Sequence, residues 1–340
     1  MPELRRDPVV GRWIIIAAER RQRPTDFLKE ERPETNSGFC PLCAGHEQTT
    51  PPEVWAYRLG GHQALNGPDW QVRVVPNKYP ALRIEGHLDK AGDGVYDRMN
   101  GIGAHEVIIE SPNHGEQLAY LPPEKVFYVL LAYRERILDL KNDMRFRYVM
   151  IFKNHGRAAG ASLEHSHSQL IALPVIPQMI VSEMDGAASY YHFRERCVYC
   201  DVIAHEIRQD IRVVGQNDDF IVLSPYAPRT PFEMWVLPKA HDSGYSRQSD
   251  KSLASLAEIL SQTLRRLDAL IAGVPYNFVL HTDPLRSGGL DHYHWHLEIV
   301  PKLTSIAGFE WGSGFYINPM PPEEATRHMK DAMPDKEGRP

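Results

Sequence analysis

The chain contains an internal repeat, and this repeat limits the folds that it can adopt. The segment Glu106–His114 (EVIIESPNH) matches Glu233–His241 (EMWVLPKAH) at an offset of 127 positions (233 minus 106). The same offset relates three further pairs: His165 with His292, His167 with His294, and Pro174 with Pro301. One shift without a gap therefore aligns roughly seventy residues, and this length of register indicates a duplicated supersecondary unit.

Each unit has the pattern of a strand, a helix and two further strands. We predict strands at 107–110, 148–153 and 165–173 with a helix at 123–142, and then strands at 234–237, 276–281 and 292–300 with a helix at 250–272. Apolar residues match across the shift at helical spacing, so each helix should bury one stripe. We therefore predict an α+β fold with two repeats, 1–178 and 179–340, whose antiparallel sheets join into one larger sheet or half-barrel flanked by helices.

Composition and charge argue against several classes of function. The 340 residues are 42% apolar and 24% charged, which is typical of a soluble globular enzyme. A formal charge of -6 without a basic run argues against nucleic acid as the main partner, although a small phosphorylated substrate remains compatible with it. The segment Met1–Asp7 lacks the apolar core of a signal peptide, and no run of about 18 apolar residues could span a membrane. We therefore expect a cytoplasmic protein.

All four cysteines fall into two C-x-x-C pairs, Cys40 with Cys43 and Cys197 with Cys200. Two thiolates at this spacing can bind one metal ion from a turn, and zinc is the usual ion. In a reducing compartment, four cysteines that all fall into such pairs favour a metal site over a disulfide. A redox pair normally lies at the start of a helix in a thioredoxin-like unit, and two pairs far apart in the chain do not suggest one. We therefore favour zinc.

Histidines stand at alternating positions in both units, at His165 and His167 and again at His292, His294 and His296. On a strand, His165, His167 and Gln169 point to one face. A lone histidine in such a place is usually a hydrogen-bonded surface imidazole, but a pattern that occurs twice weakens this interpretation. A neutral imidazole is a competent nucleophile toward phosphorus when one ring nitrogen is held and the other is free.

Groups that can stabilise phosphate oxygens lie close to these histidines in the sequence. Gln169 is a reasonable hydrogen-bond donor on the same strand face. The turn Gly156–Ser162 offers backbone N–H groups and a hydroxyl as a phosphate cradle. Glycine-rich turns are common, so the turn by itself is weak evidence.

Several short motifs occur together: Arg20–Pro24, Cys40–Cys43, Val75–Pro80, Ser111–His114, Lys153–Gly156, Gly160–Ser162 and His165–Gln169. This combination resembles the galactose-1-phosphate uridylyltransferase family, the transferase branch of the histidine triad superfamily, over almost the whole chain. The resemblance implies a duplicated histidine-triad (HIT-like) fold. In that family a histidine takes the nucleotidyl group from a nucleotide sugar, releases a sugar 1-phosphate and passes the nucleotide to a second one. By resemblance His167 is this nucleophile, and Gln169 and Ser162 contact the phosphates.

The resemblance also implies binding sites. It assigns a closed, structural zinc site to four residues: Cys40, Cys43, His114 and His165. It places four others near the nucleotide and phosphates: Arg20, Arg23, Asn77 and Asn154. An arginine pair would neutralise a diphosphate, although without the resemblance the segment Arg20–Arg23 is equally well a solvated charge run. Near the carboxyl end, Gly308, Phe309 and Glu310 resemble a segment that reaches the sugar site of a neighbouring subunit, which implies a homodimer.

The chain departs from the family's pattern at the active strand and at the second metal site. Well-known members have His-Pro-His-Gly-Gln or a close variant, whereas this chain has His-Ser-His-Ser-Gln, a form that also occurs in a relative that works as an ADP-glucose phosphorylase. Some members hold a second metal through a glutamate and three histidines. At those positions this chain has Glu183, His281, His296 and Glu298.

The additional C-x-x-C pair predicts a second zinc site made by Cys197, Cys200, His241 and one later histidine. Internal symmetry with His165 selects His292, whereas the phosphorylase-like relative selects His294, and we predict His294. Iron in place of zinc stays open at this site. The second unit is then a degenerate copy that has kept metal binding, and each chain has one catalytic centre.

The leading prediction is a ping-pong uridylyltransferase that converts UDP-glucose and galactose 1-phosphate into glucose 1-phosphate and UDP-galactose through a uridylyl-histidine. One alternative is an ADP-glucose phosphorylase, in which inorganic phosphate attacks the nucleotidyl-histidine. Another alternative is a zinc-stabilised nucleotide-binding protein without turnover. The intact His167 and Gln169 argue against this last alternative, because a pure binding module does not need a nucleophile with its donor.

Overall fold

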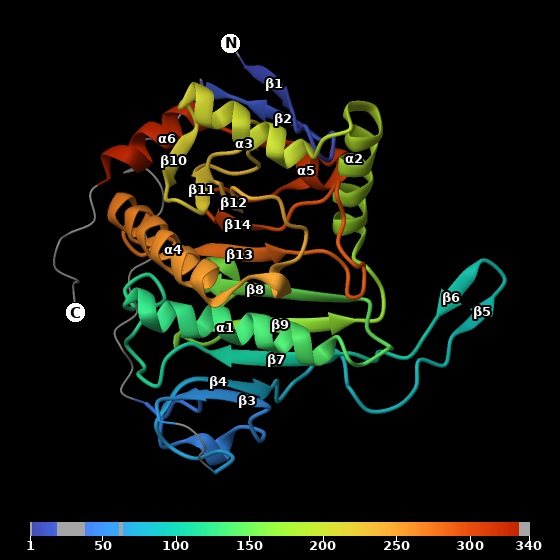
Figure 1. Cartoon of the computed structure of the whole chain (residues 1–340), viewed down its shortest axis with the longest axis vertical. Coiled ribbons are helices and arrows are strands. Elements are labelled where there is room, and N and C mark those ends of the chain that lie inside the picture. The colour runs from blue at the N-terminus through green and yellow to red at the C-terminus, as the bar shows by residue number, and fades with distance from the viewer. Residues whose placement is uncertain (1, 19–37, 61–63, 333–340) are drawn as a thin grey trace.

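The structure is a computed structural model, and it describes residues 2–18, 38–60 and 64–332. The main sheet consists of the strands β3 (Trp55–Arg58), β4 (Trp70–Pro76), β7 (Ala104–Ile109), β8 (Tyr148–His155), β9 (His167–Leu173), β10 (Val213–Gln216), β11 (Phe220–Leu223), β12 (Met234–Pro238), β13 (Tyr276–His281) and β14 (His296–Pro301). Their order across the sheet is β10-β11-β12-β14-β13-β8-β9-β7-β4-β3 (Figure 1). Every neighbouring pair is antiparallel, so the predicted α+β fold with antiparallel strands is confirmed.

The two halves of this sheet repeat each other. Strands β7, β8 and β9 with helix α1 (Pro123–Leu140) form the first unit, and β12, β13 and β14 with helix α4 (Asp250–Leu270) form the second. The units meet where β8 pairs with β13, so that Asn154 lies opposite Asn277. Helices α1 and α4 pack against each other over one face of the sheet (Figure 1). The repeat therefore builds one continuous sheet, while the division into 1–178 and 179–340 stays a prediction.

The histidine-bearing strands begin later than predicted. The offset between corresponding residues of the two units also differs there from 127. Strand β9 starts at His167 and β14 at His296, so His165 and His292 precede the strands. His165 Nε2 lies 2.8 Å from the carbonyl oxygen of Ser111, and His294 Nε2 lies 2.9 Å from that of Pro238. Ser111 and Pro238 are 127 positions apart, but His165 and His294 are 129 apart (294 minus 165). The ungapped shift is therefore wrong in this strand, because the second unit has two more residues before it.

Each long helix buries the predicted apolar stripe. The matched positions are buried in both helices: Val126, Val129, Ile137 and Leu140 in α1, and Leu253, Leu256, Leu264 and Leu267 in α4. Helix α1 begins at Pro123, where the missing N–H costs nothing in the first turn. Helix α4 is capped by Ser249, whose hydroxyl accepts a hydrogen bond from the N–H of Ser252. Both helices end two residues earlier than predicted.

The opposite face of the sheet is covered differently in the two units. Over the second unit, helices α2 (Gln178–Arg194) and α3 (Val198–Gln209) bury Trp235 and Leu237 in a separate apolar cluster, to which Val9 of the N-terminal segment also belongs. That segment forms β1 (Glu3–Arg6) and β2 (Trp13–Ile16), and β15 (Tyr316–Asn318) runs parallel beside β2. Over the first unit, Phe152, Asn154 and Gln169 are only half-buried, so this part of the face is accessible.

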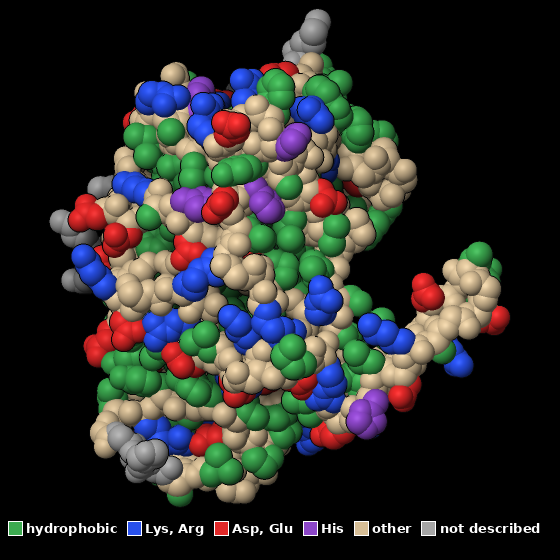
Figure 2. Space-filling view, turned by 45° about the vertical axis from the view of Figure 1, so that its right-hand side comes forward, with side chains coloured by type: hydrophobic (Ala, Val, Ile, Leu, Met, Phe, Trp, Pro, Cys, Tyr) green, Lys and Arg blue, Asp and Glu red, His purple; other side chains and the backbone are tan. Residues whose placement is uncertain are grey.

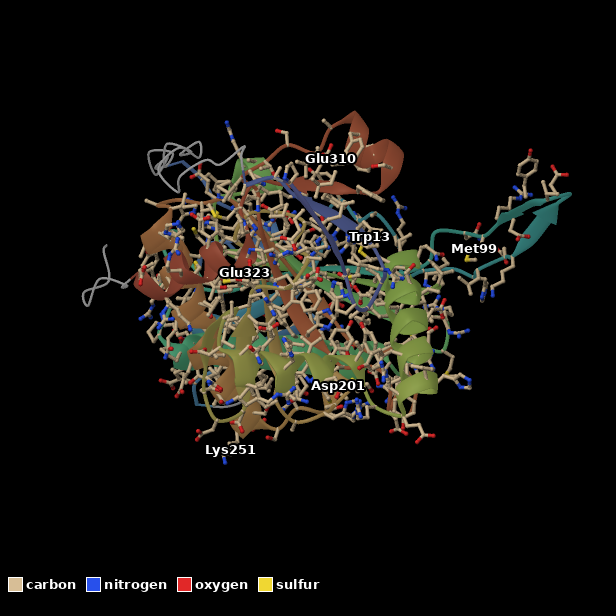
Figure 3. All side chains as sticks on the ribbon, turned by 90° about the horizontal axis from the view of Figure 1, so that it is seen from above. Trp13, Met99, Asp201, Lys251, Glu310 and Glu323 are labelled. Carbon is tan, nitrogen blue, oxygen red and sulfur yellow. The ribbon has the colours of Figure 1, made fainter. Side chains whose placement is uncertain are left out.

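Three peripheral elements complete the described chain. Strands β5 (Ala91–Asp93) and β6 (Tyr96–Arg98) form a hairpin arm that projects from the body (Figures 1 and 2). Helix α6 (Pro322–Asp331) packs against α4. The short helix α5 (Gly308–Ser313) lies at the edge of the body, and its Glu310 is far from Met99 at the arm (Figure 3). Among the described residues, no helix is long and apolar enough to cross a bilayer.

Candidate active site and metal centres

The first residue of β9, His167, has a buried ring that is held by a backbone carbonyl. The residue is 6% exposed, and its Nδ1 lies 2.7 Å from the carbonyl oxygen of His165. A carbonyl only accepts hydrogen bonds, so Nδ1 carries the proton and Nε2 keeps its lone pair. Burial lowers the pKa of His167 below its usual value, and the charge of Lys153 acts in the same direction. The ring is therefore neutral near pH 7 and can act as a nucleophile through Nε2.

Next on the same sheet face, Gln169 has an amide that is in contact with His105 of β7. His105 Nε2 lies 2.9 Å from Gln169 Oε1 and 3.2 Å from Asn77 Nδ2. On the other side of the ring, the backbone N–H of Ala81 donates to His105 Nδ1 over 3.1 Å. The structure therefore brings the predicted residues Gln169 and Asn77 together around a histidine that the sequence analysis did not single out.

Asn154 of β8 is supported by a residue of the second unit. Asn277 Nδ2 lies 2.8 Å from Asn154 Oδ1 and 2.8 Å from the carbonyl oxygen of Ala159. Both asparagines line a cavity of about 380 Å³ on the accessible part of the sheet face, together with Phe152, which pairs with Gln169 in the ladder. The second unit therefore contributes to the surroundings of the nucleophile strand.

In the glycine-rich turn Gly156–Ser162, part of the backbone forms hydrogen bonds within the turn itself. The N–H groups of Ala159, Gly160 and Ala161 all donate to carbonyl groups within the turn. Gly156 and Gly160 have φ values of +79° and +90°, which favour glycine. These three N–H groups are therefore not free to bind phosphate, and the predicted cradle loses them. Of the groups predicted there, the exposed Ser162 hydroxyl remains available.

A buried charged network lies beneath the nucleophile strand. Lys153 and Glu110 are 1% and 0% exposed, and Lys153 Nζ lies 2.6 Å from Glu110 Oε2. Burial alone would raise the pKa of Glu110, but the ammonium of Lys153 and the serine hydroxyls lower it, so the carboxylate is charged. Lys153 also donates to the carbonyl of His167 over 3.1 Å. Ser166 and Ser168 donate to the two oxygens of Glu110, a contact that proline or glycine at these positions could not make.

The first metal-type group consists of Cys40, Cys43, His114 and His165, whose ligand atoms all lie within 4.8 Å of one another. His165 Nδ1 lies 3.6 Å from each sulfur, and His114 Nδ1 lies 3.7 Å from Cys43 Sγ. Around one tetrahedral ion with bonds of ~2.3 Å to sulfur and ~2.0 Å to nitrogen, such atoms are about 3.5 Å apart. The bond from His165 Nε2 to Ser111 leaves Nδ1 for a metal. These four residues could therefore hold one ion.

The second group has the same construction, with Cys197, Cys200, His241 and His294. Cys200 Sγ lies 3.4 Å from His241 Nδ1 and 3.7 Å from His294 Nδ1. His294 Nε2 faces the carbonyl of Pro238 at 2.9 Å, as His165 faces that of Ser111. The alternative, His292, instead packs against Tyr191 and does not belong to the group.

A third buried group contains Glu183, His281, His296 and Glu298. His281 Nδ1 lies 2.9 Å from Glu183 Oε2, and Glu298 forms an ion pair with the guanidinium of Arg229. Burial alone would lower the pKa of His281, but the two carboxylates raise it. Each carboxylate therefore already has a hydrogen-bonded or charged partner from the protein, with which an added metal ion would have to compete.

In the second unit, His296 takes the place of the nucleophile. Its Nδ1 faces the carbonyl of His294 at 3.1 Å, as His167 faces that of His165. Its ring, however, is 1% exposed and packs against Tyr199 and Trp235. A substrate cannot reach this ring without displacing the aromatic side chains.

The remaining predicted residues lie elsewhere. Arg20 and Arg23 lie outside the described residues. Gly308 and Phe309 are exposed on α5, whose Glu310 lies at the edge of the body (Figure 3). The hydrogen bonds described for Phe309 and Glu310 stay within α5 and its ends and do not reach His167.

Sequence reasoning missed several residues that surround the nucleophile. Glu110 directly precedes the motif Ser111–His114, and Lys153 is the first residue of the motif Lys153–Gly156, although neither residue was given a role; these positions were the available signal. His105 and Asn277 had no such signal, because their contacts depend on how distant strands pair.

Family models and known proteins match almost the whole chain. A family model described as the N-terminal domain of galactose-1-phosphate uridyl transferase matches residues 1–177, and a model described as a domain of unknown function matches residues 123–339. The chain is 37% identical to ADP-glucose phosphorylase of Arabidopsis thaliana, covering 97% of this chain and 93% of that protein. It is 27% identical to galactose-1-phosphate uridylyltransferase of Thermotoga maritima, covering 97% and 98%.

Solved structures give the same result for the fold. The crystal structure of an ADP-glucose phosphorylase from Arabidopsis thaliana with bound ADP-glucose superposes with a TM-score of 0.83 at 35% identity, covering 98% of this chain and 100% of that one. A uridylyltransferase structure superposes with a TM-score of 0.75 at 27% identity, covering 98% of each chain.

Proposed function

This chain belongs to the galactose-1-phosphate uridylyltransferase family of nucleotidyltransferases, and we propose that it transfers a nucleotidyl group from a nucleotide sugar through His167. The observation that carries this proposal is the state of the His167 ring, whose Nδ1 proton is held by the His165 carbonyl while Nε2 keeps a free lone pair. Gln169 and Asn154 lie around it as amide donors for phosphate oxygens.

The reaction has two displacements. In the first, Nε2 of His167 attacks the α-phosphorus, the bond from this phosphorus to the bridging oxygen breaks, and the sugar 1-phosphate leaves with the electron pair. The carbonyl of His165 accepts a hydrogen bond from the Nδ1–H group and so stabilises the positive charge that develops on the ring. In the second, a phosphate oxygen of the acceptor attacks, the nitrogen–phosphorus bond breaks, and its electrons return to Nε2.

For the nucleotide and the acceptor, we propose adenylyl transfer from ADP-glucose to inorganic phosphate, which yields ADP and glucose 1-phosphate. The support is the 37% identity to an ADP-glucose phosphorylase along 97% of the chain and the serine form of the active strand. The second candidate is the uridylyl transfer from UDP-glucose to galactose 1-phosphate. It is favoured by the family model over residues 1–177 and by relatives such as the Thermotoga maritima enzyme.

Labelled substrates distinguish the two candidates. The protein is incubated with ADP-glucose or UDP-glucose that carries the label on the α-phosphate, and the acid-labile adduct is mapped by mass spectrometry of peptides. We expect an adenylyl adduct on His167 that inorganic phosphate discharges as ADP. A uridylyl adduct that galactose 1-phosphate discharges as UDP-galactose would support the second candidate instead. No adduct from either sugar nucleotide would contradict both and leave a nucleotide-binding protein without turnover.

We propose that the two Cys₂His₂ groups hold zinc, as their ligand chemistry and spacing support. Each set has four protein ligands, so the ion would close its coordination and serve as a structural cross-link without activating water. In the first group, His165 lies beside Cys40 and Cys43 with its ring and holds the nucleophile with its backbone carbonyl, so the ion would fix the position of that carbonyl. Iron in the second site stays an alternative that metal analysis resolves.

Metal content gives a matched test of the second site. His294→Ala should lower the metal content of the purified protein by about one ion per chain, because it removes a ligand of a four-ligand site. His292→Ala serves as the control, since it stands two residues away and belongs to no described metal-type group. Metal per chain is measured by plasma mass spectrometry, which also identifies the ion. Loss of the ion in His292→Ala but not in His294→Ala would contradict the assignment.

Two further assignments stay proposals. Arg20, Arg23 and Asn77 would bind the nucleotide diphosphate, and the charge of the arginines supports this role. Gly308, Phe309 and Glu310 of the exposed α5 would complete the sugar site of a second copy, so that the protein works as a homodimer. The position of α5 at the edge of the body is compatible with this arrangement.

A further inference from the structure

We infer that His105 and Asn277 are positioning residues that turn the amide N–H groups of Gln169 and Asn154 toward the transferring phosphoryl group. The inference concerns how the site is held together, and its catalytic consequence rests on the proposed function. Each of the two residues contacts one of these amide side chains and is itself fixed by a backbone group.

The protonation of His105 follows from its neighbours. The N–H of Ala81 is a donor that cannot change its role, and it points at His105 Nδ1 over 3.1 Å. Nδ1 must therefore be the acceptor, so a neutral ring carries its proton on Nε2. Two amides lie near that proton: Gln169 at 2.9 Å, and Asn77 Nδ2 at 3.2 Å. Asn77 Oδ1 accepts a hydrogen bond from the N–H of Tyr79, so its Nδ2 is a donor and cannot accept the proton, which leaves the oxygen of the Gln169 amide as its acceptor. The amide of Gln169 is therefore oriented with Oε1 toward His105 and with its NH₂ group free to donate elsewhere.

Asn154 is oriented in a similar way, but here the group whose hydrogen-bonding role cannot change is a backbone carbonyl. The carbonyl of Ala159 only accepts, and the near atom of Asn277 lies 2.8 Å from it, so this atom is the Nδ2 donor. Asn277 Nδ2 also lies 2.8 Å from Asn154, which must then present its oxygen. The NH₂ group of Asn154 is therefore free as well.

The orientation of these amides decides the sign of the charge that faces the substrate. An amide that presents NH₂ stabilises the negative oxygens of a phosphoryl group, whereas a flipped amide presents an oxygen and repels them. Nothing in an isolated glutamine or asparagine prefers one orientation, because its two ends have nearly the same shape. Since Asn277 belongs to β13, the second unit has kept a task in catalysis although its own histidine is buried.

Kinetics test the positioning role. His105→Phe and Asn277→Leu remove the orienting donors and should each lower kcat about 10- to 100-fold, a usual effect of losing an orienting partner, with KM little changed. If His105 acts through Gln169, His105→Phe should cost nothing further in a Gln169→Ala background. In contrast, the losses in the double variant His105→Phe/Asn277→Leu should multiply. His192→Phe, an exposed substitution on α2, is the control and should leave kcat unchanged.

A second measurement does not depend on activity. Long-range ¹H–¹⁵N spectra of the full chain labelled at histidine report which ring nitrogen carries the proton, with His192 and His105 identified by substitution. We expect His105 as the Nε2–H tautomer. The Nδ1–H tautomer would overturn the inference, and so would a full additional loss of kcat from His105→Phe in the Gln169→Ala background. If neither sugar nucleotide gives an adduct, the proposed function fails, while the tautomer still decides whether His105 orients Gln169.

Discussion

Replacing His167 by alanine should abolish nucleotidyl transfer while the metal content of the protein stays unchanged. The variant lacks the only nitrogen that the proposed mechanism uses to attack phosphorus, and loss of a covalent nucleophile lowers kcat by at least about 10⁴-fold. Metal content should not change, because the proposed ligand atom of His165 is Nδ1, whereas His167 contacts the backbone carbonyl of His165, which alanine at position 167 leaves in place. The proposal therefore gives His165 and His167 separate functions.

The measurement combines three readings on one preparation: adduct formation with labelled ADP-glucose and UDP-glucose, steady-state turnover, and metal per chain. His192→Ala, an exposed histidine on α2, is the matched control and should retain all three. Loss of metal together with activity in His167→Ala would show that His167 supports the metal group as well. Retention of the adduct would place the nucleophile on another residue.

Replacing Lys153 by methionine should destabilise the protein by about 3–5 kcal/mol, the usual effect of removing one partner of a buried ion pair. Glu110 is fully buried, and among the described residues its carboxylate would keep the hydroxyls of Ser166 and Ser168 as its side-chain partners without the ammonium. The carbonyl of His167 would also lose the hydrogen bond that it accepts from Lys153 Nζ. We therefore expect activity to fall as well, because the nucleophile strand would no longer be held in one position.

Urea denaturation followed by far-UV circular dichroism measures this effect. Lys330→Met is the matched control, because Lys330 forms an exposed pair with Asp210 at 3.1 Å, and exposed pairs contribute little. Adding Glu110→Gln to Lys153→Met should recover part of the loss, since the double variant no longer buries an unpaired charge. A decrease of less than about 1 kcal/mol for Lys153→Met would show that the pair does not support the strand.

The elements of the fold follow from local patterns, and His167 was proposed as the nucleophile from the family resemblance of a short motif. The apolar stripe of α1 is encoded within the helix itself, so the sequence predicted Val126, Val129, Ile137 and Leu140 correctly as buried. The C-x-x-C pairs are equally local, and the histidines that join them were predicted as the structure groups them. The position of His167 next to Gln169 requires only the alternation of a strand.

The residue-by-residue correspondence between the histidine strands of the two units could not be derived from local patterns. Pro174 and Pro301 keep the offset of 127, so the sequence gives no sign that the second unit gains two residues before β14. The hydrogen bonds of His165 and His294 show the true correspondence, because they depend on which strands lie side by side. For the same reason, internal symmetry in the sequence pointed to His292, whereas the metal-type group contains His294.

The sequence by itself determined that the chain is a duplicated α+β unit with two cysteine–histidine groups and one strand that carries the proposed nucleophile. The tertiary structure decided what holds the neighbours of that histidine in place: the carboxylate beneath Ser166 and Ser168, the ring behind Gln169, and the asparagine from the second unit behind Asn154. The physical reason is the range of the interactions. A periodic pattern is a property of neighbouring residues, whereas the Asn277–Asn154 contact joins residues 123 positions apart and exists only when the whole sheet has formed.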